Sequence, residues 1–235
     1  MFLLHSGAGD APFNMALDEA LLDAMPRLGQ PVLRFYSWNE RAATFGYFQK
    51  FSEVERATPL RPLVRRPTGG GIVPHDADWT YSLAFPAGHE WHSLHATESY
   101  HRVHAWIQSA FSKLNVPSEL APCCKKLETK NPKPGSAPPI GQCFLGYEKS
   151  DVLWHGRKIA GAAQRRNKLG LLIQGSVQPP PISLSRADWE KAMQQAGEEK
   201  FSIHWQMLAP DEQLQESAKR LVAEKYSQAA YNQKR

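Results

Sequence analysis

Three consecutive glycines, Gly69, Gly70 and Gly71, lie between two short apolar runs in LVRRPTGGGIVPHDADWTYSLAFP, residues 63–86. A run of glycines lets the backbone adopt positive φ values and point its N–H groups at an anion or a carbonyl group. Such a run also costs more backbone entropy than a simple two-residue turn requires. The stretch therefore predicts a β-hairpin whose glycine tip borders a binding pocket. A glycine-rich hairpin with a polar tip and no ligand is the alternative.

Charged side chains flank this turn on both sides. Arg65 and Arg66 precede the glycines, and His75 and Asp76 follow them. Because adjacent residues of a strand face opposite sides, we expect only one of the two arginines to point into a pocket beside the turn. We expect His75 and Asp76 to close the far side of that pocket. The glycine spacing fits neither the phosphate-binding loop of nucleotide triphosphatases nor a dinucleotide fingerprint, so the common nucleotide-binding turns are excluded.

Apolar alternation and β-branched runs predict several strands around this turn. They cover residues 31–38, 42–49, 78–86 and 168–177, with a hairpin over 151–166 that turns at His155 and Gly156. Gly46 lies within the second strand, where it marks a close approach of another backbone segment. The order of helices and strands predicts an α+β fold with a mixed, mostly antiparallel sheet flanked by helices.

Helical spacing of apolar residues appears before, between and after these strands. It predicts a helix over residues 14–25 ended by Pro26 and Gly29, a helix from about 97 to 114, and closing helices at about 208–232. Residues 179–210 are expected to be irregular with short helices. No composition change marks a linker, so we expect a single domain over residues 1–235.

The composition excludes several classes of protein. The chain has 28 Lys and Arg against 23 Asp and Glu, a net charge of +5, and no dense basic run. This balance excludes a dedicated nucleic-acid binder and suits an acidic protein partner. The chain has no run of about eighteen apolar residues and no basic start of a signal peptide, so we expect no membrane span. Three sparse cysteines favour a reducing cytoplasm over a disulfide framework.

Two further segments stand out by composition. Residues 121–142 are rich in Pro, Gly, Ser and Lys and predict a long loop, which in compact domains is usually functional or disordered. Five histidines fall at positions 89, 92, 95, 101 and 104. No thiol or tight ligand set accompanies them, so we expect solvated or capping histidines and no bound metal.

Several ordered motifs resemble the family of lipoate-protein ligases and octanoyltransferases, which is related to biotin protein ligase. RRPTGGGIVPHD resembles the signature of this family, and NMALDEALL and RFYSWNERAATFGYFQ resemble its first helix and first hairpin. ESYHRVH resembles the following helix, GRKIAGAAQRR the lysine-bearing strand, and LLIQGSV the strand paired with it. The resemblance spans about residues 10–232. It implies the fold of a biotin or lipoate protein ligase catalytic domain, with an acyl pocket under the glycine turn.

The resemblance implies that Lys158 lies in this pocket and holds the carbonyl or carboxyl end of an acyl group. The residues alone leave two possibilities for this lysine. Within the apolar stretch WHGRKIAGAA, a lysine amine that faces the core is costly, whereas an amine at a sheet edge lies in solvent. Backbone N–H groups around Gly70 and Gly71, or around Gly161 and Ala162, are the expected donors to an oxyanion.

Cys143 separates two chemistries within this family. It lies fifteen residues before Lys158 and resembles the nucleophilic cysteine of the octanoyltransferases. A nearby Lys158 ammonium would favour the reactive thiolate. The alternative is that Cys143 is a small buried hydrophobic residue. The chain also departs from the family pattern, because Gln174-Gly175 stands where the family often has His-Gly.

The resemblance implies an acyltransferase that moves an octanoyl group from acyl carrier protein, through an acyl-cysteine, to a lysine of a lipoyl-acceptor domain. The acceptor would be the glycine cleavage H protein or a dehydrogenase E2 domain. An ATP-dependent lipoate-protein ligase catalytic domain that lacks the C-terminal accessory domain is one alternative. A non-catalytic acyl-binding relative is another. We expect a monomer with no cofactor and no nucleic-acid partner.

Overall fold

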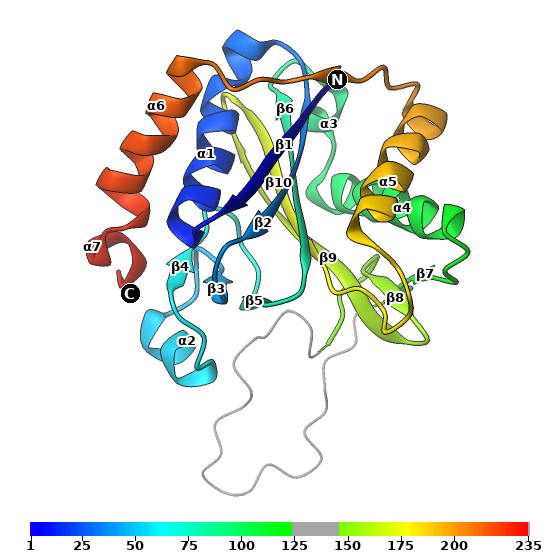
Figure 1. Ribbon diagram of the computed structural model, residues 1–235, viewed down its shortest axis with the longest axis horizontal. Helices are drawn as coiled ribbons and strands as arrows, with labels where there is room; N and C mark the ends of the chain where they lie inside the picture. The colour runs from blue at the N-terminus through cyan, green and yellow to red at the C-terminus, as the bar shows by residue number, and fades with distance from the viewer. Residues whose placement is uncertain (124–145, 235) are drawn as a thin grey trace, which may run out of the picture.

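The computed structural model describes residues 1–123 and 146–234. Within these residues, an eight-stranded sheet runs through the middle of the molecule in the order β11-β1-β2-β6-β10-β9-β8-β7 (Figure 1). Strand β1 pairs in parallel with β2 and β11, whereas the other neighbours pair antiparallel. The predicted mixed, mostly antiparallel sheet is therefore confirmed. Its strands are β1 Phe2–Gly9, β2 Val32–Trp38, β6 Trp79–Pro86, β7 Glu119–Leu120, β8 Val152–Trp154, β9 Arg157–Asn167, β10 Gly170–Val177 and β11 Gln206–Met207.

Helices cover both faces of this sheet (Figure 1). Helices α1 (Ala11–Leu28) and α6 (Glu212–Leu221) pack together on one side, and α4 (Ala96–Lys113) and α5 (Arg186–Phe201) pack together on the other. The shorter helical segments are α2 Phe51–Ala57, α3 Glu90–Ser93, the π-helical turn η1 Val222–Tyr226 and α7 Ala229–Asn232.

Alternation along the central strands builds a core on each face of the sheet. In β2, Leu33 and Phe35 belong to the same cluster as Trp106 of α4 and face α4 and α5. Val32 points the other way and belongs to the cluster that includes Leu17 of α1. Burial of apolar surface stabilises a fold by about 25 cal/mol per Å². Because both faces of the central strands bury such surface, these strands form a rigid base for the residues at their ends.

Helix α1 begins earlier and ends later than the sequence pattern predicts. The side chain of Asp10 caps its first turn by accepting a hydrogen bond from the backbone of Phe13. Pro26 does not end the helix but lies inside its last turns, so that prediction is wrong. Gly29 does end it, in a left-handed conformation with φ of 67°. A proline removes only one N–H donor, and beyond it Leu28 still packs against the same apolar cluster as Met25.

The glycine turn does not join a β-hairpin, which corrects the sequence prediction. Strands β4 (Leu63–Arg65) and β5 (Val73–His75) flank β3 (Ala42–Phe45) in a separate three-stranded sheet. Strand β3 pairs in parallel with β4 and antiparallel with β5, so the glycines cross from one edge of β3 to the other. The predicted close approach at Gly46 is confirmed, because a Cβ atom there would lie 1.9 Å from the carbonyl oxygen of Gly70.

Of three other segments, one matches its prediction and two do not. The hairpin of β8 and β9 is confirmed, and both turn residues have positive φ, 47° for His155 and 72° for Gly156. Residues 186–201, expected to be irregular, form the long helix α5, with Ser185 capping its first turn. Its pattern is weakly amphipathic, and Trp189 and Met193 provide much of its buried face. Strand β1 was not predicted, since its pairing with β2 is set by contacts across the sheet.

Candidate functional site

A cavity opens where β9 and β10 of the large sheet meet the small sheet. Together with its mouth it holds about 460 Å³ of unfilled space, within the range of small-molecule sites. Apolar side chains make up one part of its wall and polar side chains converge on another. The lining residues are Met15, Tyr36, Thr44, Arg66, Val73, His75, Thr80, Lys158, Gly161, Ala162, Ala163, Gln174, Gly175 and Ser176.

Lys158 of β9 points its amine into this cavity although only 7% of its side chain is exposed. Its Nζ atom lies 2.7 Å from Oδ2 of Asp151, whose side chain is fully buried. The Tyr100 hydroxyl donates to Oδ1 of Asp151 at 2.5 Å, and the backbone N–H of Glu148 donates to Oδ2 at 2.7 Å. Burial, followed by the charge of Asp151, raises the pKa of Tyr100. The phenol therefore stays protonated and holds the carboxylate that faces Lys158.

His104 lies behind the same cluster, which corrects the expectation that it is solvated or a cap. It is completely buried, its ring meets Tyr100 edge-on at 4.2 Å, and its ring nitrogens have no hydrogen-bond partner among the described residues. Burial and then the charge of Lys158 lower its pKa to about 3. His104 is therefore a neutral core residue. His89, by contrast, caps α3 by accepting from the N–H of Trp91.

The two arginines before the glycine turn have separate surroundings, as the alternation of strand residues predicts. Arg66 lines the cavity and donates to the carbonyl oxygens of Gly69 at 2.6 Å and Gly71 at 2.8 Å. Arg65 is fully buried on the other side and is not a lining residue. The glycines themselves do not line the cavity, whereas Gly161 and Ala162 do. Donation of an N–H from Gly70 or Gly71 to an oxyanion stays a prediction.

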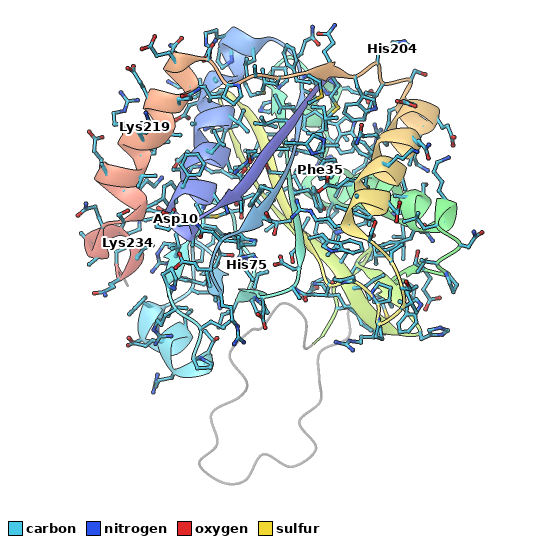
Figure 2. All side chains as sticks on the ribbon, viewed as in Figure 1. Asp10, Phe35, His75, His204, Lys219 and Lys234 are labelled. Carbon is cyan, nitrogen blue, oxygen red and sulfur yellow. The ribbon has the colours of Figure 1, made fainter. Side chains whose placement is uncertain are left out.

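His75, the last residue of β5 in the small sheet, lines the cavity and is labelled in Figure 2. Its Nδ1 atom is 3.0 Å from Oδ2 of Asp78, and its Nε2 atom is 2.9 Å from the hydroxyl of Thr44. Trp38 stacks on the imidazole with the ring centres 3.7 Å apart. Asp76 is not brought to the cavity, because its exposed side chain pairs with Arg41. Asp78, three residues after His75, takes the place that the sequence analysis gave to Asp76.

Gln174 connects the cavity to a buried ion pair beneath it. Its amide nitrogen donates to Oδ2 of Asp18 at 2.7 Å, and its amide oxygen accepts from Thr68 at 2.8 Å. The other carboxylate oxygen, Oδ1 of Asp18, accepts from Arg34 at 2.6 Å. Because Thr68 immediately precedes the glycines, this network ties α1 and β10 to the glycine turn.

The model of the family described as the lipoyl protein ligase A/B catalytic domain matches residues 10–179 of this chain. The chain belongs to this family. The matched region contains α1, the glycine turn and the cavity-lining strands β9 and β10.

Among curated relatives of this lipoyl protein ligase A/B chain are two bacterial proteins named octanoyltransferase LipM. The one from Staphylococcus aureus is 35% identical over 181 residues, 74% of this chain and 64% of the relative. The one from Bacillus subtilis is 34% identical over 180 residues, 74% of this chain and 63% of the relative. The chain thus spans less than two thirds of the length of these relatives.

Solved structures show that the fold of this lipoyl protein ligase A/B chain is shared. Lipoate-protein ligase A bound with ATP is 20% identical, with a TM-score of 0.74 over 99% of this chain and 97% of that chain. The bi-partite lipoate protein ligase from Thermoplasma acidophilum, described with its E2 lipoyl domain, is 20% identical. Its TM-score is 0.73 over 98% of this chain and 95% of that chain.

Further predictions for this lipoyl protein ligase A/B domain concern the nucleophile, the long loop, bound metal and a membrane span. Cys143, the predicted nucleophile, lies outside the described residues, as does most of the predicted loop at 121–142. Within residues 1–123 and 146–234, no cluster of three or more His, Cys, Asp or Glu side chains could hold a metal ion. In the same part of the chain, no helix has the length and apolar character needed to cross a membrane.

Sequence reasoning missed several acidic residues of the site. Asp151, Asp78 and Asp18 each face a basic or imidazole partner that is distant in sequence or across a turn. A signal was present for the Asp18–Arg34 pair, since an acidic residue within the apolar pattern of a helix and a basic residue within an apolar strand each need a buried partner. For Asp78, the signal was its spacing of three residues from His75.

Proposed function

We propose that this chain is an octanoyltransferase that acts in protein lipoylation. It takes an octanoyl group from acyl carrier protein onto Cys143 and passes it to a lysine amine of a lipoyl-acceptor domain. The expected acceptors are the glycine cleavage H protein and a dehydrogenase E2 domain. A monomeric state and a cytoplasmic location belong to the same proposal.

The pairing of Lys158 with Asp151 is the observation that carries this proposal. A buried ammonium is unfavourable unless it is paired, and its presence at a cavity wall suits a ligand that carries a carbonyl oxygen. Lys158 would donate a hydrogen bond to the acyl carbonyl while Met15, Tyr36 and Val73 contact the aliphatic chain. The names of the curated relatives support octanoyl transfer for the region that they share with this chain.

The proposed first step forms one bond and breaks another at the acyl carbon. The Cys143 thiolate attacks the thioester carbonyl, and the carrier thiolate leaves and takes up a proton. Developing negative charge on the carbonyl oxygen would be stabilised by Lys158 and by the backbone N–H group of Gly161, in the manner of an oxyanion hole. Arg66 would brace the glycine turn through its bonds to Gly69 and Gly71.

Intact mass measurement after mixing the protein with octanoyl-carrier protein, without ATP, tests this proposal. We expect a gain of one octanoyl group that hydroxylamine removes, and no gain in a Cys143→Ser variant. Cys123→Ser is the matched control, because Cys123 is an exposed free thiol. It should acylate like the unchanged protein. No adduct, together with no transfer to a lipoyl domain, would overturn the proposal. Lipoylation that requires ATP and free lipoate would instead identify a ligase.

A further inference from the structure

Protons move at both steps of the proposed acyl transfer. The carrier thiolate takes up a proton as it leaves, and the acceptor ammonium must lose one before its nitrogen can attack. Among the described residues, two side chains with a cationic form and a long stem, Arg66 and Lys158, line the cavity. Of these two, only Lys158 can exchange a proton, because a guanidinium is not deprotonated in proteins. The surroundings of the Lys158 amine therefore bear on the rate of both steps.

The Asp151 carboxylate that faces this amine is held from several sides. Its Oδ2 atom lies 2.7 Å from Nζ of Lys158 and accepts the backbone N–H of Glu148 at 2.7 Å. Its Oδ1 atom accepts the Tyr100 hydroxyl at 2.5 Å. The backbone carbonyl of Asp151 accepts the N–H of Ala121 at 2.8 Å. The fully buried carboxylate therefore has a fixed place, with Lys158 and Tyr100 on its two different oxygens.

Helix α4 holds the Tyr100 hydroxyl against this carboxylate. Tyr100 lies one helical turn before His104, and the two rings meet edge-on with their centres 4.2 Å apart. His104 is completely buried, so it fixes the position of the Tyr100 ring. Burial, followed by the charge of Asp151, raises the pKa of Tyr100 above its ordinary value of 10.0. The phenol therefore keeps its proton and remains a donor to Asp151.

The phenol and the ammonium share one negative charge. A hydrogen bond to a carboxylate stabilises its charged form and reduces the negative charge that it presents to another partner. The Tyr100 hydroxyl therefore weakens the attraction between Asp151 and the Lys158 ammonium. A weaker attraction makes it easier for Lys158 to release a proton.

Other charged or titratable groups surround this pair. They are Arg66 and His75 on the cavity wall, Tyr81 on β6, His101 and His104 on α4, and Glu148 and Lys149 before β8. The side chains at 101, 148 and 149 are exposed, so solvent screens their charges. Burial raises the pKa of Tyr81 and lowers that of His104 to about 3, which keeps both neutral. Asp151 is fully buried and in contact with the amine, so its charge is the least screened.

We propose that Tyr100 acts through Asp151 to set how readily Lys158 exchanges a proton during acyl transfer. Tyr100 and Asp151 are positioning residues, because neither lines the cavity and both act through Lys158. This inference rests on the proposed function.

The proton exchange balances in the first step. The neutral amine of Lys158 takes the proton of the Cys143 thiol, and the thiolate attacks the acyl carbon. The new C–S bond forms and the C–S bond to the carrier breaks. The carrier thiolate leaves with the proton from the Lys158 ammonium, so the amine is neutral again.

The charge of the Lys158 amine is measured directly by NMR on protein whose lysines carry ¹³C at Cε. The signal is assigned by its loss in Lys158→Met, and its chemical shift is followed as the pH is changed. We expect Tyr100→Phe to raise the titration midpoint of this signal by about one pH unit, because Asp151 then presents more charge to the ammonium. Phenylalanine fills the same space as tyrosine, so the fold should be kept.

Tyr226→Phe is the matched control. Tyr226 is also fully buried, and its hydroxyl donates to the carboxylate of Glu19 at 2.6 Å. The same carboxylate oxygen lies 2.5 Å from Nζ of Lys225. This variant removes the same kind of hydrogen bond outside the cavity and should leave the Lys158 midpoint unchanged. An unchanged midpoint in folded Tyr100→Phe, or an equal rise in Tyr226→Phe, would overturn the inference.

Asp151→Asn should move the midpoint in the opposite direction. Without the carboxylate, burial favours the neutral amine, so the Lys158 signal should titrate at a lower pH than in the unchanged protein. A purely structural role of Tyr100 and Asp151 would not produce shifts of opposite sign. If Asp151→Asn does not fold, Tyr100→Phe and its control decide the question.

The pH dependence of acyl-enzyme formation connects this titration to the reaction. Intact mass measured over time should show that the limb of the pH–rate profile governed by Lys158 moves to higher pH in Tyr100→Phe, by the same amount as the NMR midpoint. A rate that falls equally at every pH would overturn the inference, since it would indicate a structural effect alone.

These measurements separate failure of the inference from failure of the proposed function. The NMR titration needs no acyl donor, so it judges the effect of Tyr100 on Lys158 in either case. If the unchanged protein forms no acyl-enzyme but uses ATP and free lipoate, the octanoyltransferase proposal fails, and the pH–rate profile is measured for that reaction. If it modifies a lipoyl domain under neither condition, both proposals are overturned.

Discussion

The side chain of Lys158 lies directly against Gly161 of the same strand, β9. A Cβ atom on Gly161 would lie 2.5 Å from Cε and 2.7 Å from Nζ of Lys158. The same Cβ atom would lie 3.2 Å from Oδ1 of Asp151. A side chain at position 161 would therefore displace the end of the Lys158 side chain from this ion pair. The φ of Gly161 is not positive, so its backbone conformation does not call for glycine.

Gly161→Ala should displace the Lys158 amine while leaving the strand intact. A displacement of about 1 Å at a reacting group typically reduces a rate by about 10²-fold, and we expect a loss of acyl transfer near that size. Acyl-enzyme formation measured by intact mass over time would report it. Gly88→Ala is the control, because a Cβ atom there meets nothing within 4 Å. Equal rates for the two variants would contradict the prediction.

Asp151→Asn should destabilise the protein as well as impair it. Breaking a buried ion pair leaves an uncompensated charge, at a cost of about 3–5 kcal/mol in the free energy of unfolding. In a second variant, Lys158→Met combined with Asp151→Asn, the buried charge is gone. We expect urea unfolding to show partial recovery of stability in this double variant, with no recovery of acyl transfer. Equal stability of the single and double variants would argue against the pair.

Substitutions of Arg65 and Arg66 should affect different properties, the free energy of unfolding for Arg65 and the rate of acyl transfer for Arg66. Arg65 donates to five carbonyl oxygens that link the small sheet to the C-terminal segment: Tyr47, Gln49, Tyr231, Asn232 and Lys234. Arg65→Met leaves these buried acceptors without their charged donor and should lower the free energy of unfolding by roughly 3 kcal/mol or more. Arg66→Met should mainly reduce acyl transfer, because Arg66 holds the glycine turn. Thermal unfolding and transfer rates of both variants check this division.

His104 should make the protein less stable in acid. Its pKa is lowered to about 3 in the folded state from an ordinary value of 6.5. Between these values the unfolded chain binds the extra proton, so stability falls as the pH falls, by up to about 1.4 kcal/mol per pH unit. His104→Leu should reduce this slope in urea unfolding between about pH 6 and pH 4. His95→Gln, an exposed residue just before the same helix, should not change it.

Local patterns were sufficient where neighbours in sequence decide the structure. The turn at His155 and Gly156 follows from residues that accept positive φ, and β2, β6 and β10 follow from their apolar runs. Helix α5 and strand β1 were not recognised. Trp189 and Met193 of α5 are buried by packing against α4, and β1 is held by its parallel pairing with β2 and β11. The interpretation of residues 1–235 as one domain stays a prediction.

The amino-acid sequence by itself determined the family, the α+β class with its mixed sheet, the close approach at Gly46 and the division of Arg65 and Arg66 between two faces. These depend on ordered motifs, on strand alternation and on the small size of glycine, all of which are local. Only the tertiary structure decided that the glycines cross β3, that Asp78 rather than Asp76 faces His75, and that Asp151 pairs with Lys158. Each of these depends on which segments meet in space, and a buried charge is matched by whichever partner the packing brings within reach.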